Sequence, residues 1–150
     1  MLRDDLQSAL KTAMLTKDSV TTGALRMIIA GQKEKDVEAR GKGQDKASDT
    51  ELLSMMQGMI KQRNDSIKMY IDGNRPELAE KEKAEIAVIE RFLPKQMSDA
   101  EVEEAIKSII AEVAASSMKD MGKVMGALKA KYVGQMDFGK ANGFIKALLG

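Results

Sequence analysis

The spacing of apolar residues most restricts what this chain can fold into, because it is helical nearly everywhere. Apolar side chains recur three and four residues apart from Leu2 to Met14, and the same spacing returns in each later segment. Only two prolines interrupt the 150 residues, and no segment carries a convincing strand pattern. The sequence therefore predicts an all-α protein.

Capping patterns divide the chain into seven expected helices. A Ser followed three residues later by Glu is a capping box, in which each side chain bonds the other residue's backbone N–H. This pattern occurs at Ser48-x-x-Glu51 and at Ser98-x-x-Glu101, where the third and fifth helices are expected to begin. The other starts after the first helix are expected at Thr21 or Thr22, Asn74-Arg75-Pro76-Glu77, Ser117-x-x-Asp120 and Asp137.

The apolar stripes of these helices form the expected core. They run from Leu2 to Met14, Leu25 to Val37, Leu52 to Ile71, Leu78 to Phe92, Val102 to Val113, Met121 to Leu128 and Phe138 to Leu148, and the stem of Arg63 joins the third stripe. The acidic residues Glu80, Glu82, Glu85 and Glu90 are expected on a solvated face, because Lys81 and Lys83 interleave with them.

Leu93-Pro94-Lys95 interrupts the helical pattern, since proline cannot continue a helix and restricts the residue before it. The expected organisation is an N-terminal four-helix domain over residues 1–94 and a small C-terminal three-helix domain over residues 95–150.

Composition excludes most catalytic chemistry. The chain has no Cys and no His, which rules out thiol nucleophiles, imidazole bases and the commonest metal ligands. Gly134-x-x-x-x-Gly139-Lys140 lacks the Ser or Thr that completes a phosphate-binding loop, and a glycine turn between two helices is the favoured interpretation. Ser8-x-x-Lys11 and Ser116-x-x-Lys119 match a nucleophile spacing without the elements that would support it. We expect no catalytic residue, no cofactor and no metal.

Charge is balanced overall but separated near the C-terminus. The net charge is +1, yet residues 118–150 carry six lysines against Asp120 and Asp137. No apolar run is long enough to span a membrane, and Met-Leu-Arg-Asp-Asp does not resemble a targeting segment. These observations favour a cytoplasmic location and a positive surface confined to the C-terminal helices.

The segment from Ser117 to Lys129 combines glycine with lysine in an unusual way. On a helical wheel Gly122 and Gly126 lie beside the apolar stripe, and Lys119 and Lys123 lie beyond them. Each helical glycine costs about 1 kcal/mol relative to alanine, so some contact should compensate. Two interpretations stay open: close approach of a neighbouring helix, or a smooth backbone surface that receives phosphates.

This segment and several others resemble the YqeY family of GatB/YqeY-domain proteins. The matching blocks are Met59-Ile60-Lys61-Gln62-Arg63, Glu80-Lys81-Glu82-Lys83-Ala84-Glu85-Ile86, Phe92-Leu93-Pro94-Lys95-Gln96, Met121-Gly122-Lys123-Val124-Met125-Gly126 and Phe144-Ile145-Lys146-Ala147-Leu148-Leu149. The C-terminal part is also similar to the tail of GatB, the B subunit of the glutamine-dependent Asp/Glu-tRNA amidotransferase. The resemblance implies a two-part helical architecture and a link to tRNA, without catalysis by this chain.

Together these observations favour a non-catalytic accessory module that binds tRNA or another structured RNA. The candidate RNA-binding residues are Lys119, Gly122, Lys123, Gly126, Lys129 and Lys131. A protein-interaction domain that docks through its C-terminal helices is the alternative. A carbon–nitrogen ligase with glutamine as amide donor is retained only because the shared domain would suggest that label.

Overall fold

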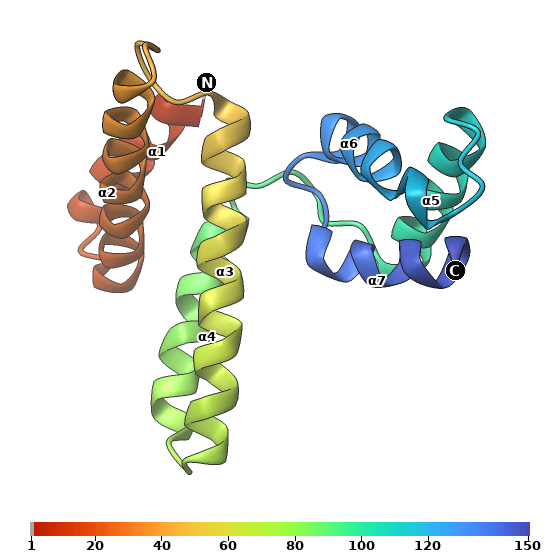
Figure 1. Cartoon of the computed structure of the whole chain (residues 1–150). Coiled ribbons are helices and arrows are strands. Elements are labelled where there is room, and N and C mark those ends of the chain that lie inside the picture. Colours follow the sequence, from red (N-terminus) through yellow and green to blue (C-terminus); the bar gives the residue numbers. More distant parts are fainter. Residues whose placement is uncertain (1) are drawn as a thin grey trace. The chain divides into compact units, whose positions relative to one another are not determined.

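The computed structural model describes residues 2–150, and these residues form helices and no strand. The helices are α1 (Leu2–Leu15), α2 (Ser19–Gly41), α3 (Asp49–Asp72), α4 (Pro76–Glu90), α5 (Asp99–Glu112), the 3₁₀ helix η1 (Met118–Asp120), α6 (Met121–Tyr132) and α7 (Phe138–Leu149) (Figure 1). The chain divides into an N-terminal unit that ends at Leu93 and a C-terminal unit, Pro94–Gly150. The all-α prediction is confirmed for the described residues.

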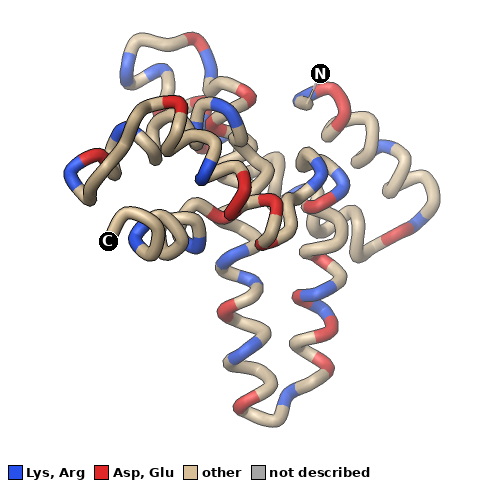
Figure 2. The backbone as a smooth tube through the Cα atoms, turned by 90° about the vertical axis from the view of Figure 1, so that its right-hand side faces the viewer, with Lys and Arg blue, Asp and Glu red and all other residues tan. Residues whose placement is uncertain are grey.

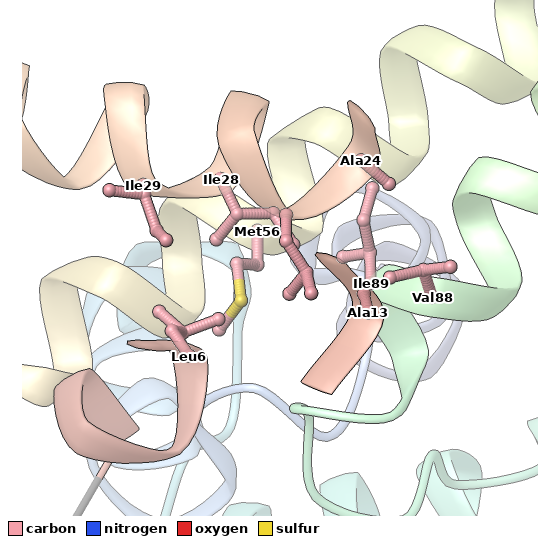
Figure 3. Close-up of a cluster of buried hydrophobic side chains, with 9 residues drawn as sticks. Leu6, Ala13, Ala24, Ile28, Ile29, Met56, Val88 and Ile89 are labelled. Carbon is pink, nitrogen blue, oxygen red and sulfur yellow. The ribbon is translucent and has the colours of Figure 1, made fainter. Parts of the chain in front are cut away.

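All four helices of the N-terminal unit contribute to one apolar core. α3 packs along α4 as an antiparallel hairpin, and α2 packs against α1, α3 and α4. The core residues shown in Figure 3 come from each helix: Leu6 and Ala13 from α1, Ala24, Ile28 and Ile29 from α2, Met56 from α3, and Val88 and Ile89 from α4. This agrees with the stripes expected from helical spacing.

Four apolar residues that were expected in the core are exposed instead. Each lies within the last five residues of its helix, and the exposed fractions are 52% for Met14, 63% for Val37, 56% for Ile71 and 40% for Leu148. Helical periodicity predicts the direction of a side chain, but it does not predict whether a neighbouring helix extends far enough to cover it. The expected stripes were therefore too long at their C-terminal ends.

The local helix starts are partly as expected. Ser48 and Ser98 cap α3 and α5, each accepting a hydrogen bond from the backbone N–H three residues on, and Asp137 caps α7. The predicted cap of α2, Thr21 or Thr22, was wrong by three or four residues, because Asp18 is the cap and Thr21 is the donor. Helix α4 begins at Pro76, inside the expected segment, but the expected side-chain cap is absent, since Arg75 occupies the cap position without a side-chain hydrogen bond.

A buried ion pair joins α3 to α4 and overturns part of the solvated-face prediction. Nε of Arg63 lies 3.0 Å from Oε2 of Glu85 and 3.8 Å from Oε2 of Glu82. Arg63 and Glu85 are each only 9% exposed, whereas Glu80 and Glu90 are exposed as expected. Figure 2 shows that positive and negative residues are mixed along the α3–α4 hairpin. Because most of these charges are exposed, the sequence pattern alone does not indicate that Arg63 and Glu85 are buried.

A second charged cluster ties the loop before α3 to α1 and α2. Arg3 donates from Nη1 and Nη2 to the two carboxylate oxygens of Asp36, each at 2.7 Å. Nη2 of Arg3 also donates to the carbonyl of Ala47, whose N–H donates to Asp36 at 2.9 Å. The residues of this cluster are 11 to 44 positions apart, so they fix long-range geometry rather than a local turn.

This cluster makes part of the stability dependent on pH. The hydrogen bonds from Arg3 hold the pKa of Asp36 at about 2, below its ordinary 3.8. A pKa that is lower in the folded protein than in the unfolded chain stabilises the fold at any pH above the unfolded-state pKa. For Asp36 this contribution is roughly 2 kcal/mol, and it is lost as the pH falls from about 4 to about 2. The free energy of unfolding, measured by urea denaturation at a series of pH values, should therefore fall more steeply between about pH 4 and about pH 2 for the wild type than for Asp36→Asn. Parallel curves for the two proteins would contradict this assignment.

The C-terminal unit packs α5, α6 and α7 around a separate core. Its buried residues are Val102, Ala105, Ile106, Ile109, Val124, Leu128, Met136, Ala141 and Ile145. Gln96 donates to the carbonyl of Gly134 at 2.6 Å, and the N–H of Met97 donates to the carbonyl of Gln135. These bonds hold the segment before α5 against the turn that connects α6 to α7. No helix in the described part of the chain is long and apolar enough to cross a membrane.

Candidate functional site

The candidate surface lies on α6, whose buried side agrees with the sequence analysis. Val124 and Leu128 are fully buried, and Met121 and Met125 are half-buried beside them. Gly122, Gly126 and the lysines of α6 are exposed. The helix therefore has one face in the core of the C-terminal unit and one face turned to solvent.

The two glycines of α6 have no packing role within their unit. A Cβ atom added at Gly122 or at Gly126 would meet no heavy atom within 4 Å. Within the described C-terminal unit, no neighbouring helix approaches the backbone there. The sequence left open the close approach of a neighbouring helix, and the helices of this unit do not make that contact, so a strip of backbone is exposed on its surface.

The structure brings together some of the candidate lysines and separates others. At 100° per residue, Lys129 lies 20° from Gly122, and Lys123 lies 60° from Gly126. We call the residues Gly122, Lys123, Gly126 and Lys129 the lysine–glycine face. Lys131 lies nine positions after Gly122, half a turn away, and its Nζ is 5.7 Å from the ring centroid of Tyr132.

Lys119 lies next to this face but not on the same helix. The sixth helix was expected to begin at Ser117-x-x-Asp120. These residues instead form the 3₁₀ turn η1, and α6 begins at Met121. Asp120 accepts hydrogen bonds from the N–H groups of Ser116 at 2.9 Å and Ser117 at 3.4 Å. The bond from Ser116 is the main cause of a lowered pKa for Asp120, and the charge of Lys123 lowers it further.

An internal repeat in the sequence extends the pattern to α7. Residues 121–130 read MGKVMGALKA, and residues 138–147 read FGKANGFIKA, with Gly, Lys, Gly, Lys and Ala at the same five positions. Burial follows the same register, because Val124 and Leu128 correspond to Ala141 and Ile145. Gly143, the counterpart of Gly126, is also open to solvent.

The second copy of the repeat differs from the first in its charge. Nζ of Lys140 lies 2.9 Å from a carboxylate oxygen of Asp99 at the start of α5, so this lysine is already paired. Lys146 is exposed, as Lys129 is. The α6 copy therefore offers the more accessible positive charge, and Lys146 and Gly143 are candidates that the sequence analysis did not name.

The motif resembling a phosphate-binding loop is a helix–turn–helix junction. Helix α6 precedes Gly134, where a phosphate-binding loop needs a strand. The carboxylate of Asp137 accepts hydrogen bonds from the N–H groups of Gly139 and Lys140, which a phosphate would otherwise need. The glycine-turn interpretation is confirmed.

The remaining chemistry is sparse. Ser8 and Lys11 are exposed on α1, and Ser116 and Lys119 are exposed near η1. Within residues 2–150, no group of three Asp or Glu side chains is arranged to hold a metal ion.

Comparison with known proteins identifies the family and a set of relatives. The family model described as "Yqey-like protein" matches residues 3–149. A protein named "Altered inheritance of mitochondria protein 41, mitochondrial" from Lachancea thermotolerans is 32% identical over 115 residues, covering 75% of this chain and 60% of the relative. Proteins of the same name are 39% identical over 88 residues in Candida glabrata and 29% identical over 107 residues in Saccharomyces cerevisiae. These matches cover 59% and 70% of this chain.

The match covers only part of those relatives, between 47% and 60% of their length. All three are named as mitochondrial proteins, which contradicts the expected cytoplasmic location. Location is set by a targeting segment and not by the helices of a folded domain. The expectation rested on the residues Met-Leu-Arg-Asp-Asp and on the lack of a membrane-spanning run, and the names of these relatives overturn it.

Proposed function

The chain belongs to the Yqey-like protein family, and we propose that its C-terminal unit binds structured RNA, with tRNA as the first candidate. The binding surface is the lysine–glycine face of α6, with Lys119 beside it. The similarity to the tail of GatB that the sequence suggests belongs to this proposal. The chain acts in it as an accessory module and not as a catalyst.

The observation that carries the proposal is the open space over Gly122 and Gly126. Gly126 lies inside α6 and costs about 1 kcal/mol relative to alanine, and Gly122, the second residue of the helix, adds up to about the same amount. No contact within the described C-terminal unit compensates for this cost. A partner that packs against the exposed glycine backbone would compensate for it. The lysines beside the glycines favour a partner with negative charge.

The composition of the unit favours an RNA backbone over exposed bases. The chain has no Trp, and Tyr132 packs with Phe138 and Phe144 around the core of the C-terminal unit. Proteins that bind single strands stack bases on exposed aromatic rings, whereas folded RNA is recognised through phosphates and shape. Lysines beside an exposed glycine backbone suit the recognition of folded RNA through its phosphates.

Replacing both glycines by alanine tests the proposal, because it separates stability from binding. Gly122→Ala/Gly126→Ala should raise the free energy of unfolding by about 1–2 kcal/mol, since alanine favours the helix and meets no neighbour. The same variant should bind tRNA more weakly, because two methyl groups stand where the RNA backbone would lie. Urea denaturation and equilibrium RNA binding measure the two effects.

Gly23→Ala/Gly58→Ala is the matched control, because both glycines lie inside helices of the N-terminal unit and are equally open. It should gain similar stability and keep the RNA affinity of the wild type. Wild-type RNA binding by the α6 variant would contradict the proposed surface. If that variant instead lost a ribonuclease-resistant protein partner, the protein-interaction alternative would replace RNA binding.

We also propose that the two units are separate domains, of four helices over residues 1–94 and three over residues 95–150. Each has its own apolar core, and the interval between α4 and α5 lacks regular structure from Leu93 to Ser98. Limited proteolysis should cut first at residues 93–98 or in the loop at 42–48. First cuts inside α3 would contradict this division.

A further inference from the structure

A small cavity in the N-terminal unit lies away from the surface proposed for RNA. Its volume is about 270 Å³, and it is a half-open depression bordered by α1, the start of α2 and the residue that follows α4. Ser8 and Thr12 on α1 and Thr16 in the turn that follows it line the space at four-residue intervals. Asp18 and Arg91 complete its polar lining.

The two charged residues of this cavity carry opposite charges but do not pair with each other. Asp18 and Arg91 both line the space, yet they form no ion pair within the described part of the chain. Each oxygen of Asp18 accepts one hydrogen bond from Thr21, at 3.1 and 2.7 Å. These bonds are the main cause of a lowered pKa for Asp18, and the charge of Arg91 adds to it. The carboxylate is therefore fixed and ionised, with lone pairs left to accept a further donor.

The other polar groups of the cavity are also available to a ligand. The guanidinium of Arg91 lies 5.7 Å from the centroid of the Phe92 ring and donates no hydrogen bond within residues 2–150. The hydroxyls of Ser8 and Thr12 likewise have no hydrogen-bond partner there, whereas that of Thr16 is used by the carbonyls of Thr12 and Ala13. The hydroxyls of Ser8 and Thr12 and the five N–H donors of the Arg91 guanidinium thus line the same cavity as the Asp18 carboxylate.

We propose that this cavity binds a small zwitterion that carries one carboxylate and one ammonium group, such as a free α-amino acid. The ligand carboxylate accepts paired hydrogen bonds from Arg91, and its ammonium group donates to Asp18. The hydroxyls of Ser8 and Thr12 can donate or accept between these two ends. A ligand with only one charge would form an ion pair with only one of these two residues, and the other would remain hydrated.

The size of the cavity supports the same class of ligand. Sites for drug-sized molecules and cofactors occupy roughly 300–1,000 Å³, and this cavity lies just below that range. Its volume suits a compact molecule of a few heavy atoms beyond its charged groups. The inference concerns the N-terminal unit and does not depend on RNA binding by the C-terminal unit.

Titration of the full chain with L-alanine, followed by amide chemical shifts, tests the site. We expect saturable shifts confined to residues 8–21 and the neighbourhood of Arg91. Acetate and methylamine, which each carry one of the two charges, should bind at least about tenfold more weakly. Asp18→Asn, which keeps a good helix cap, and Arg91→Gln should each lower the L-alanine affinity at least about tenfold.

Asp65→Asn and Arg75→Gln are matched controls, since both residues are exposed in the same unit and line no part of the cavity. Both controls should bind L-alanine as the wild type does. The proposal is overturned if L-alanine gives no saturable shifts, if acetate alone binds as tightly, or if Asp18→Asn and Arg91→Gln leave the affinity unchanged.

Discussion

Glu85→Ala should lower the free energy of unfolding by about 3 kcal/mol or more, because it leaves the charge of Arg63 buried without its main partner. Arg63 also donates to the carbonyl of Met59 and to Sδ of Met27, so its side chain is held in place and cannot turn out to solvent at low cost. Glu82 remains 3.8 Å away and keeps part of the attraction, which places the loss toward the lower end of the usual range of about 3–5 kcal/mol.

Two further variants separate this effect from a simple loss of packing. Arg63→Met/Glu85→Leu removes both charges and fills the same space, so it should retain most of the wild-type stability. Glu80→Ala removes an exposed carboxylate that pairs with Lys83, and it should change stability by less than about 1 kcal/mol. Urea denaturation measures all three. An equal effect of Glu85→Ala and Glu80→Ala would contradict a buried role for Glu85.

The parts of the fold that sequence could predict are those set by near neighbours in the chain. Ser48, Ser98 and Asp137 begin helices because each side chain meets a backbone N–H two or three residues away. The all-α class follows for the same reason, since helical periodicity is repeated within each segment. Asp18 was missed in favour of Thr21 because both residues suit a helix start, and only the backbone geometry decides which one is the cap.

The parts that sequence could not predict depend on distant residues. Arg63 and Glu85 are 22 positions apart, and Arg3 and Asp36 are 33 apart. Nothing in the alternation of Glu and Lys along α4 distinguishes Glu85 from its exposed neighbours. Its burial follows only from the packing of α4 against α3.

The candidate site shows both kinds of outcome. Helical spacing assumed that Gly122, Lys123 and Gly126 share one helix, and all three lie in α6. It misplaced Lys119, since a 3₁₀ turn comes before the helix, and it could not show whether the glycines meet a neighbour. The repeat that links 121–130 to 138–147 was present in the sequence and needed only a comparison of the chain with itself.

Lys123→Glu/Lys129→Glu should weaken RNA binding by about 100-fold at low salt, since each lost charged contact is worth about 1.5 kcal/mol or more. Both side chains are exposed and neither forms an ion pair in the described part of the chain, so the fold should remain intact. Lys33→Glu/Lys61→Glu changes the net charge by the same amount on exposed positions of the N-terminal unit and is the matched control. A similar loss of binding in both variants would point to net charge alone and contradict a specific surface.

The affinity of the wild-type chain for tRNA, measured as a function of salt concentration, tests the central claim most directly. Phosphate contacts by Lys119, Lys123 and Lys129 predict that log affinity falls with log salt at a slope of about −2 to −3, reduced to about −1 or less in Lys123→Glu/Lys129→Glu. Absence of binding at low salt, or an unchanged slope in that variant, would contradict RNA recognition by the lysine–glycine face.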